Sequence, residues 1–491
     1  MAKKRVAIVG AGVAGLAAAA ILARRFDVLV FERDARPGGK IRAAEIDGRR
    51  IDCGPTVFTM RRVFEEIFAA AGANLDDHIE LTPLDVLARH AWTDGSRLDL
   101  YADATRSAAA IAKFAGAKDA DNFTRFRRAA ADVYETLYGP FIRAERPSLL
   151  RLMLRRDPLS LMRLDPYASL WRSLSRRFDD PRLRQMFARY ATYCGSSPFK
   201  APATLMLIAH VEQLGVWRVT GGVARLAEAL AELAAENGAR LAYEACVDEI
   251  TDDGVRLESG EPVRADAVLM NADLAALAAG RFGARARRAA PRRLRHATAP
   301  AKRTQSALTW SFLGDAAGFD LSMHNVFFSD DYAAEFDAVA AGRLPETPTT
   351  YVHAPDRPRP PDASSPERFF CLVNAPAVGD ARRFPEEEIS SCQKRTFEHL
   401  KRCGLIVTPD PTRTIVTTPN DFEARFPATG GALFGAPNHG WRASFQRPGA
   451  RTPAKGLYLA GGSAHPGSGV PMAAISGAMA ASAITADLAS T

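Results

Sequence analysis

A glycine-rich turn near the N-terminus, Gly10-Ala11-Gly12-Val13-Ala14-Gly15, constrains the fold more than any other feature of this chain. The run Val6–Val9 before it suits a buried parallel strand, and Ala14–Arg25 after it contains many strong helix formers. A second apolar run, Val28–Phe31, follows at once. This order predicts a βαβ unit that opens a Rossmann-like α/β domain.

The chemistry of this turn points to a dinucleotide. Gly10 permits the tight turn, Gly12 lets the backbone approach a pyrophosphate, and Gly15 lets the helix pack closely on the strand. Glu32 lies at the end of the second strand, 22 residues after Gly10, where a carboxylate can accept hydrogen bonds from ribose hydroxyls. Because a carboxylate there repels the extra phosphate of NADP, the pattern predicts FAD or NAD.

The segments behind the turn favour FAD. Arg36-Pro37-Gly38-Gly39-Lys40 with Arg42, and then Asp52-Cys53-Gly54-Pro55-Thr56, combine closely approachable backbone with cations. A second G-x-G-x-x-G is absent from the sequence, which argues against a separate NAD(P)H site. Electrons would then pass to oxygen, a quinone or another acceptor. The predicted cofactor contacts in these segments are Gly39, Lys40, Arg42, Gly54, Pro55 and Thr56.

Two later regions return to the same domain. Thr220-Gly221-Gly222 begins the predicted helix Val223–Glu236, and Arg240–Val247 resumes as a strand. Asp266–Asp273 indicates a further buried strand that reaches a loop. Val247 is the cofactor contact predicted from this region.

The C-terminal region completes the predicted cofactor site. Gly456–Gly462 is typical of a strand that ends in two glycines, and Pro471 suits the first turn of the helix that follows. The free N–H groups of that turn could stabilise negative charge on a flavin. The predicted contacts here are Gly461, Gly462, Val470, Pro471 and Met472.

The chain therefore divides into five predicted segments around a discontinuous FAD-binding domain. Helical periodicity dominates the middle of the chain, which we interpret as an inserted helical membrane or substrate region, and a mixed substrate domain follows the second part of the FAD-binding domain. The predicted boundaries are 1–97, 215–280 and 446–491 for the FAD-binding domain, 98–214 for the helical region and 281–445 for the substrate domain.

The net charge of +8 is spread unevenly. Ala284–Arg303 holds eight Lys and Arg residues without an acidic residue, and Arg143–Arg189 holds twelve against five. Neither stretch carries a nucleic-acid-binding motif, so nucleic acid is not an expected partner. The apolar residues within Arg143–Arg189 favour a membrane surface, while a solvated basic face is the equal alternative.

Targeting and cysteine patterns place the protein on the cytosolic side. Val6–Ala23 resembles a signal peptide, but its three glycines and the strand behind it exclude that reading. Glycines and prolines up to Pro471 interrupt the apolar C-terminal stretch, so we expect no spanning helix. The six cysteines show no zinc or disulfide spacing, and no metal is expected. We predict a cytoplasmic protein attached peripherally to the inner membrane.

These motifs resemble those of the bacterial phytoene-desaturase-type carotenoid desaturases, within the flavin amine-oxidase superfamily. The glycine turn, Gly38-Gly39-Lys40, Gly221-Gly222 and the segment Gly461–Gly469 carry the resemblance, which runs essentially end to end. It implies FAD, a lipophilic carotenoid substrate and an oxidation in which hydride passes to the flavin. Because a weak base or water can remove the neighbouring proton, no catalytic residue is assigned, and His465 is interpreted as a hydrogen-bonded turn histidine.

More specific segments resemble the 1-hydroxycarotenoid 3,4-desaturase branch. These are Asp52–Met60, Pro83–His90, Asp180–Tyr193 and His324–Tyr332. The resemblance implies a 3,4 double bond introduced into an acyclic 1-hydroxy- or 1-methoxycarotenoid. Phytoene or neurosporene desaturation is the first alternative, and another amine-oxidase-type oxidase or a non-enzymatic isoprenoid-binding protein are remoter ones. Several aromatic residues could line a carotenoid tunnel or simply form core: Trp171, Phe178, Phe187, Tyr190, Tyr193, Phe199 and Trp217.

Overall fold

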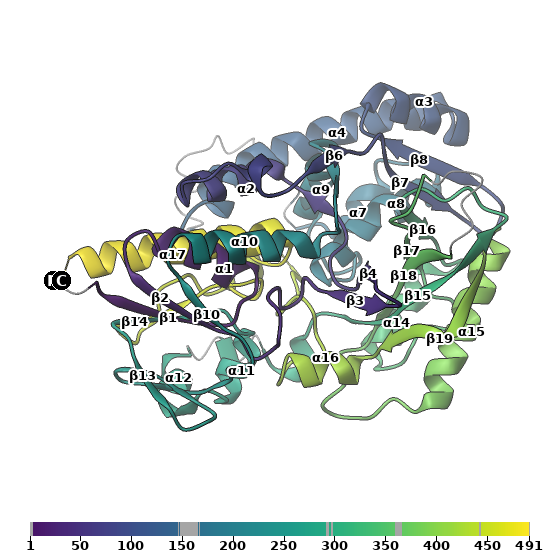
Figure 1. Cartoon of the computed structure of the whole chain (residues 1–491). Helices are drawn as coiled ribbons and strands as arrows, with labels where there is room; N and C mark the ends of the chain where they lie inside the picture. The colour runs from purple at the N-terminus through teal and green to yellow at the C-terminus, as the bar shows by residue number, and fades with distance from the viewer. Residues whose placement is uncertain are drawn as a thin grey trace.

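A computed structural model describes residues 3–145, 147, 165, 167–290, 294–295, 298–358, 366–440 and 443–490. Two sheets divide the molecule, and Lys4 and Leu488, near the two ends of the described chain, lie together beyond the first sheet (Figure 1). Parts of the two basic stretches, Arg143–Arg189 and Ala284–Arg303, lie outside the described residues.

The first sheet is fully parallel, with strand order β10-β2-β1-β14-β20. Helices α1, α10 and α17 cover one face, where small residues of α1 and α17 allow close packing (Figure 1). The sheet draws on all three parts of the predicted FAD-binding domain, which confirms the Rossmann-like prediction. Its elements are β1 Arg5–Val9, α1 Val13–Leu22, β2 Asp27–Phe31, α10 Ala224–Glu236, β10 Arg240–Ala242, β14 Ala267–Met270, β20 Leu457–Leu459 and α17 Val470–Ala489.

The opposite face of this sheet is covered by a small antiparallel sheet and two short helices. The single strand predicted over Arg240–Val247 is wrong, because Glu244 turns the chain with a left-handed φ of 53°. The strand therefore divides into β10 and β11 in two different sheets. The covering elements are β11 Val247–Thr251, β12 Gly254–Leu257, β13 Pro262–Arg264, α11 Leu274–Ala279 and α12 Gly283–Ala289.

The second large sheet is mixed, with order β19-β15-β18-β17-β16-β7-β8. Strand β16 runs parallel to β7, and the other pairs are antiparallel. Because β7 lies within residues 1–97, that segment contributes to both sheets. The elements are β7 Val86–Ala91, β8 Arg97–Tyr101, β15 Ser306–Ala317, β16 His324–Phe327, α14 Tyr332–Ala340, β17 Thr350–His353, β18 Glu367–Ala375, α15 Glu386–Arg402 and β19 Ile406–Thr417.

Helices from the middle of the chain stand above the mixed sheet, as the periodicity predicts (Figure 1). The rings of Phe126, Phe178 and Phe187 pack against one another within their core. These helices are α3 Ala104–Ala115, α4 Ala117–Leu137, α7 Leu170–Ser175, α8 Pro181–Ala188 and α9 Leu207–Gln213. Connecting elements are β3 Ala43–Ile46, β4 Arg49–Asp52, β5 Phe58–Thr59, α2 Arg61–Ala70, β6 Leu81–Pro83, β9 Val216–Val219 and α16 Pro419–Arg425. Shorter helical turns are Leu75–Asp77, Tyr138–Ile142, Arg189–Cys194, Ala203–Met206, Pro300–Lys302 and Ala443–Gln446.

Helix α17 corrects one expectation about the C-terminus. The predicted interruptions precede it or, at Pro471, lie in its first turn, so the helix runs unbroken for 20 residues. By length and composition it is the one helix in the described residues that could cross a membrane, although 44% of its apolar window is buried. Gly477 brings it against α1, where a Cβ would lie 2.1 Å from the carbonyl oxygen of Ala14. This close contact is typical of a core helix.

Candidate active site

The glycine turn between β1 and α1 is held by a residue of the neighbouring strand. Gly10 has a φ of 98°, and a Cβ at Gly15 would lie 2.3 Å from the carbonyl oxygen of Gly10. Asn271 follows β14 and donates from Nδ2 to the carbonyl oxygens of Gly10 and Gly12, at 3.1 and 3.2 Å. The start of α1 faces a cavity, where a helix N-terminus favours an anion. Sequence reasoning missed Asn271, although it recognised its strand.

Glu32 lies beside this turn, as the sequence predicts. Its Oε2 accepts a hydrogen bond from the Ala11 N–H at 2.7 Å, and its Oε1 accepts one from the Asp34 N–H at 3.0 Å. Burial raises the pKa of the Glu32 carboxyl. The carboxylate lines the cavity and retains lone pairs that could accept from a ribose hydroxyl.

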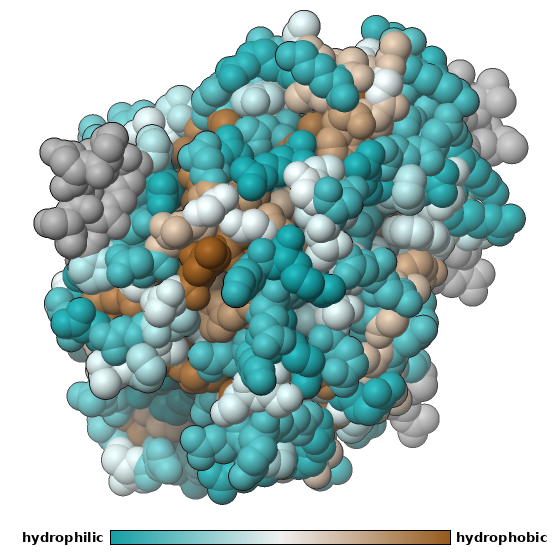
Figure 2. Space-filling model, turned by 90° about the vertical axis from the view of Figure 1, so that its right-hand side faces the viewer, coloured by the Kyte–Doolittle hydropathy of each residue, from teal (hydrophilic) through white to brown (hydrophobic). Residues whose placement is uncertain are grey.

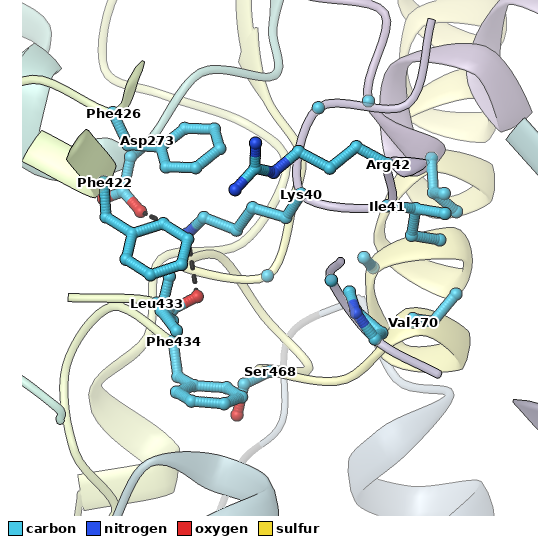
Figure 3. A pocket seen from close by; sticks show the side chains of 18 of the residues that line it. Lys40, Ile41, Arg42, Asp273, Phe422, Phe426, Leu433, Phe434, Ser468 and Val470 are labelled. Atoms are coloured by element: carbon cyan, nitrogen blue, oxygen red, sulfur yellow. Dashed lines mark hydrogen bonds and ion pairs between the residues drawn. The ribbon is translucent and has the colours of Figure 1, made fainter. Parts of the chain in front are cut away.

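Lys40 and Arg42 both line the cavity but differ in how their donors are used (Figure 3). Lys40 Nζ pairs with Asp273 Oδ2 at 3.2 Å and donates to the Leu433 carbonyl oxygen at 2.8 Å. Arg42 lies over the Phe422 ring, and its buried Nη2 has no hydrogen-bond partner in the described part of the chain. Burial lowers the pKa of Arg42. Arg42 therefore retains a donor for a ligand, whereas the Lys40 ammonium group already bonds to protein oxygens.

The segment after β4 mixes structural and cavity-facing residues. Asp52 accepts hydrogen bonds from the N–H groups of Val223 and Ala224, at 2.7 and 3.2 Å, and so fixes the start of α10. Thr220-Gly221-Gly222 consequently turns away from the main cavity and lines a smaller one of about 220 Å³. Gly54 has no room for a side chain, since a Cβ would lie 2.1 Å from the Lys40 carbonyl oxygen.

Thr56 connects this segment to the mixed sheet. Its Oγ1 lies 2.7 Å from the hydroxyl oxygen of Tyr351 on β17, which in turn lies 2.7 Å from Nδ1 of His324 on β16. Burial lowers the pKa of His324 to about 3, so its imidazole is neutral at physiological pH. These hydrogen bonds link a segment of predicted cofactor contacts directly to the mixed sheet.

The C-terminal motif closes the other side of the cavity. Gly461, Gly462, Val470 and Pro471 line it, with Pro471 in the first turn of α17. His465 is buried near this motif, and its Nε2 lies 3.0 Å from the Phe141 carbonyl oxygen. Burial lowers the pKa of His465 to about 4, and the residue does not line the cavity. This geometry agrees with a hydrogen-bonded turn histidine.

One cavity of about 740 Å³ joins these elements. We call the part around the β1–α1 turn, Glu32 and Arg42 its glycine end, and the part over Thr309, Val326, Tyr351 and Leu372 its sheet end. Of the sixteen predicted cofactor contacts, Gly15 and Met472 do not line the cavity; Gly15 lies beneath the turn as a packing residue. The lining contacts are Gly10, Gly12, Glu32, Gly39, Lys40, Arg42, Gly54, Pro55, Thr56, Val247, Gly461, Gly462, Val470 and Pro471.

A buried ion pair at the sheet end was not predicted. Arg189 Nη2 lies 3.0 Å from Glu212 Oε1, and both side chains are only 5% exposed. Tyr190 donates to Glu212, and Arg189 donates to the Tyr193 hydroxyl. The ion pair joins the turn after α8 to α9, and nothing in the sequence links positions 189 and 212. Of the seven aromatic residues considered for a tunnel, Tyr193 alone lines the described cavity.

Comparison with known proteins places the chain in a family. A model described as flavin containing amine oxidoreductase matches residues 13–485. The fold is also that of putrescine oxidase, with a TM-score of 0.63 at 16% identity over the full length of both chains, and of cyclohexylamine oxidase from Brevibacterium oxydans, with a TM-score of 0.58 at 17% identity over 99% of this chain and 100% of that one. The protein belongs to the flavin-containing amine oxidoreductase family, in its carotenoid-desaturase branch.

Within that branch the chain is most informatively compared with hydroxyneurosporene desaturases. It is 50% identical to the one from Rubrivivax gelatinosus, over 99% of this chain and 94% of that protein. It is 44% identical to the one from Cereibacter sphaeroides, over 99% and 98%. It is 29% identical to a 1-hydroxycarotenoid 3,4-desaturase from Flavobacterium, over 99% of both. The resemblance recognised in the sequence is confirmed.

Proposed function

We propose that this protein is an FAD-dependent desaturase that introduces a 3,4 double bond into an acyclic 1-hydroxy- or 1-methoxycarotenoid. The observation that carries the proposal is one continuous cavity, which joins a dinucleotide-type glycine turn to a sheet end walled by Val57, Val326 and Leu372. Near-full-length similarity to hydroxyneurosporene desaturases supports this substrate over phytoene or neurosporene.

FAD fits the glycine end. Gly12 and the start of α1 would hold its pyrophosphate, Glu32 its ribose, and the first turn of α17 the polar edge of its flavin. The unsatisfied Nη2 of Arg42 offers a further donor in the described cavity wall. We expect Gly12→Val to give folded protein without flavin, because a Cβ there would already lie 2.9 Å from Asn271 Nδ2. Stoichiometric flavin in that variant, measured by visible absorption, would contradict the assignment.

When bound, FAD supplies a hydride acceptor for the reaction. The protein's own part is to exclude water and to hold the reacting end of the polyene against the flavin. The apolar side chains of the sheet end perform the first task, and the hydrogen bond between Thr56 and Tyr351 fixes the wall that performs the second.

Direct assay of three carotenoids tests the reaction. The protein in liposomes is incubated separately with phytoene, neurosporene and 1-hydroxyneurosporene, and polyene absorption and product mass are followed. We expect 1-hydroxyneurosporene to lose two hydrogens and absorb at longer wavelength. Conversion of phytoene without conversion of the hydroxylated substrate would overturn the assigned substrate but leave a flavin desaturase.

We further propose peripheral attachment to the cytoplasmic side of the inner membrane, with oxygen or a quinone as electron acceptor. A lipophilic carotenoid has to be drawn from lipid, and Tyr167, which is 83% exposed, is close in sequence to the exposed Arg172 and Arg176. Figure 2 shows one face of the molecule, which is mainly hydrophilic, with apolar residues gathered near its centre and in smaller patches elsewhere. Flotation with anionic liposomes should succeed at low salt and weaken at high salt, and failure at both would remove the membrane proposal.

A further inference from the structure

The proposed substrate requires a polar contact inside the cavity. Its oxygen is attached to carbon 1, two bonds from carbon 3, where the reaction occurs. Because carbon 3 has to lie within the cavity, the oxygen is held away from bulk water. An oxygen buried without a hydrogen-bond partner is unfavourable, so a side chain of the cavity has to bind it.

Most polar side chains at the sheet end already have protein partners. Tyr351 is bonded to Thr56 and His324, and Arg189, Tyr193 and Glu212 bond to one another. Asn374 donates from Nδ2 to Glu335 Oε1 at 2.7 Å, and Glu335 Oε2 accepts from the Thr349 N–H at 3.1 Å. These groups shape the cavity, but their strongest hydrogen bonds are made to other protein groups.

Tyr332 is different. It is the first residue of α14, lines the cavity and is only 6% exposed, yet its hydroxyl has no hydrogen-bond partner in the parts of the chain that the structure describes. Ser306 and Thr309 also carry unpartnered hydroxyls there, but these short side chains can rotate toward backbone oxygens. Arg189 Nε is unpartnered as well, but the guanidinium is already paired with Glu212 and bonded to Tyr193 through its other nitrogens.

The phenol ring of Tyr332 is fixed by aromatic neighbours. Its centroid lies 5.0 Å from that of Phe336, 6.1 Å from Trp171 and 6.2 Å from Phe328. Burial raises the pKa of Tyr332, so the group remains a neutral O–H donor at physiological pH. A rigid, buried donor without a protein acceptor is arranged to meet an oxygen from a ligand.

We propose that the Tyr332 hydroxyl binds the oxygen of the substrate end group and so selects oxygenated carotenoids over hydrocarbons. This inference rests on the proposed function. The phenol O–H can donate to either type of substrate, since the hydroxyl oxygen and the methoxy oxygen are both acceptors. Tyr332 lies at the end of His324–Tyr332, one of the segments that resemble the 1-hydroxycarotenoid branch.

Tyr332→Phe tests the proposal. We expect it to lower affinity and kcat/KM for 1-hydroxy- and 1-methoxyneurosporene by about 10-fold, and to leave the affinity for neurosporene unchanged. Because the described residues make no hydrogen bond to this phenol, the melting temperature and flavin content should equal or exceed those of the wild type. Tyr101→Phe, at a partly exposed residue outside the cavity whose hydroxyl makes only a 3.4 Å hydrogen bond to Asp99, is the matched control and should change neither the carotenoid affinities nor the flavin content.

The outcomes separate this inference from the proposed function. Equal losses for all three carotenoids, or no loss for the oxygenated ones, would overturn the role of Tyr332. Wild-type protein that converts neither oxygenated carotenoid would instead contradict the proposed function. In that case the binding measurements still decide whether Tyr332 distinguishes an oxygenated end group from a hydrocarbon.

Discussion

At the glycine end of the cavity most contacts involve the backbone, with the Asn271 side chain as an exception, whereas at the sheet end side chains contact one another. The β1–α1 turn, the N–H bonds to Glu32 and the approach of Gly54 to Lys40 depend on residues close together in sequence or on absent side chains. The bonds Arg189–Glu212, Thr56–Tyr351 and Glu335–Asn374 instead join distant elements. A bound dinucleotide needs a shape that glycine spacing specifies, but a substrate wall needs side chains that only the folded chain brings together.

The largest effect is expected from breaking the buried ion pair of the sheet end. Arg189→Met leaves the buried Glu212 carboxylate without its charged partner, and we expect a loss of about 3–5 kcal/mol in the free energy of unfolding. Arg189→Met combined with Glu212→Leu should recover most of that loss, because neither charge remains buried. Denaturant unfolding of the two variants measures this. A single variant within about 1 kcal/mol of wild type would show that the pair is solvated.

A somewhat smaller effect is expected from pH at Glu335. Burial raises the pKa of this carboxyl from 4.5 to about 7, so the folded state holds a proton that the unfolded state releases. Stability should therefore fall by about 3 kcal/mol as pH rises from about 4.5 to 7, and stay level above it.

Unfolding free energies across this pH range, compared with those of Glu335→Gln, isolate the contribution of Glu335. The Gln side chain does not titrate, so that variant should lack this part of the fall with pH. If the free energy of unfolding of the wild type and that of Glu335→Gln rose by the same amount between pH 5 and 7, the raised pKa of Glu335 would be contradicted.

At the glycine end, Gly15→Ala should reduce the free energy of unfolding by about 1–3 kcal/mol. The new Cβ would lie 2.3 Å from the Gly10 carbonyl oxygen, and backbone cannot move aside as a side chain can. Gly139→Ala is the matched control, since nothing lies within 4 Å of its Cβ. Thermal unfolding of both variants measures the difference, and equal melting temperatures would show that the turn can yield.

The smallest effect is expected on the surface, away from both ends. Arg225 and Glu232 on α10 form two bonds of 2.6 Å, but the Glu232 side chain is half exposed. Glu232→Gln should change the free energy of unfolding by no more than about 1 kcal/mol, and less at high salt. A salt-independent loss larger than that would mean that surface charge contributes as much as the buried pair.

The contrast between the two ends also explains what the sequence could predict. Local patterns such as Gly10–Gly15 followed by Glu32 specify a strand, a turn and a helix, so the Rossmann-like parallel sheet was predicted correctly. The division of Arg240–Val247 was missed because a left-handed residue, Glu244, interrupts an otherwise uniform apolar pattern. Asn271, Arg189 with Glu212, and the unpartnered Tyr332 were missed because each role depends on residues far away in the sequence.

Anaerobic mixing of the flavin-loaded protein with 1-hydroxyneurosporene tests the central claim most directly. Without an external electron acceptor, the account predicts that the visible flavin absorption is lost in proportion to the carotenoid that gains a double bond. Neurosporene at the same concentration should reduce less flavin. Formation of the product while the flavin stays oxidised, or flavin that the hydroxylated carotenoid never reduces, would contradict the account.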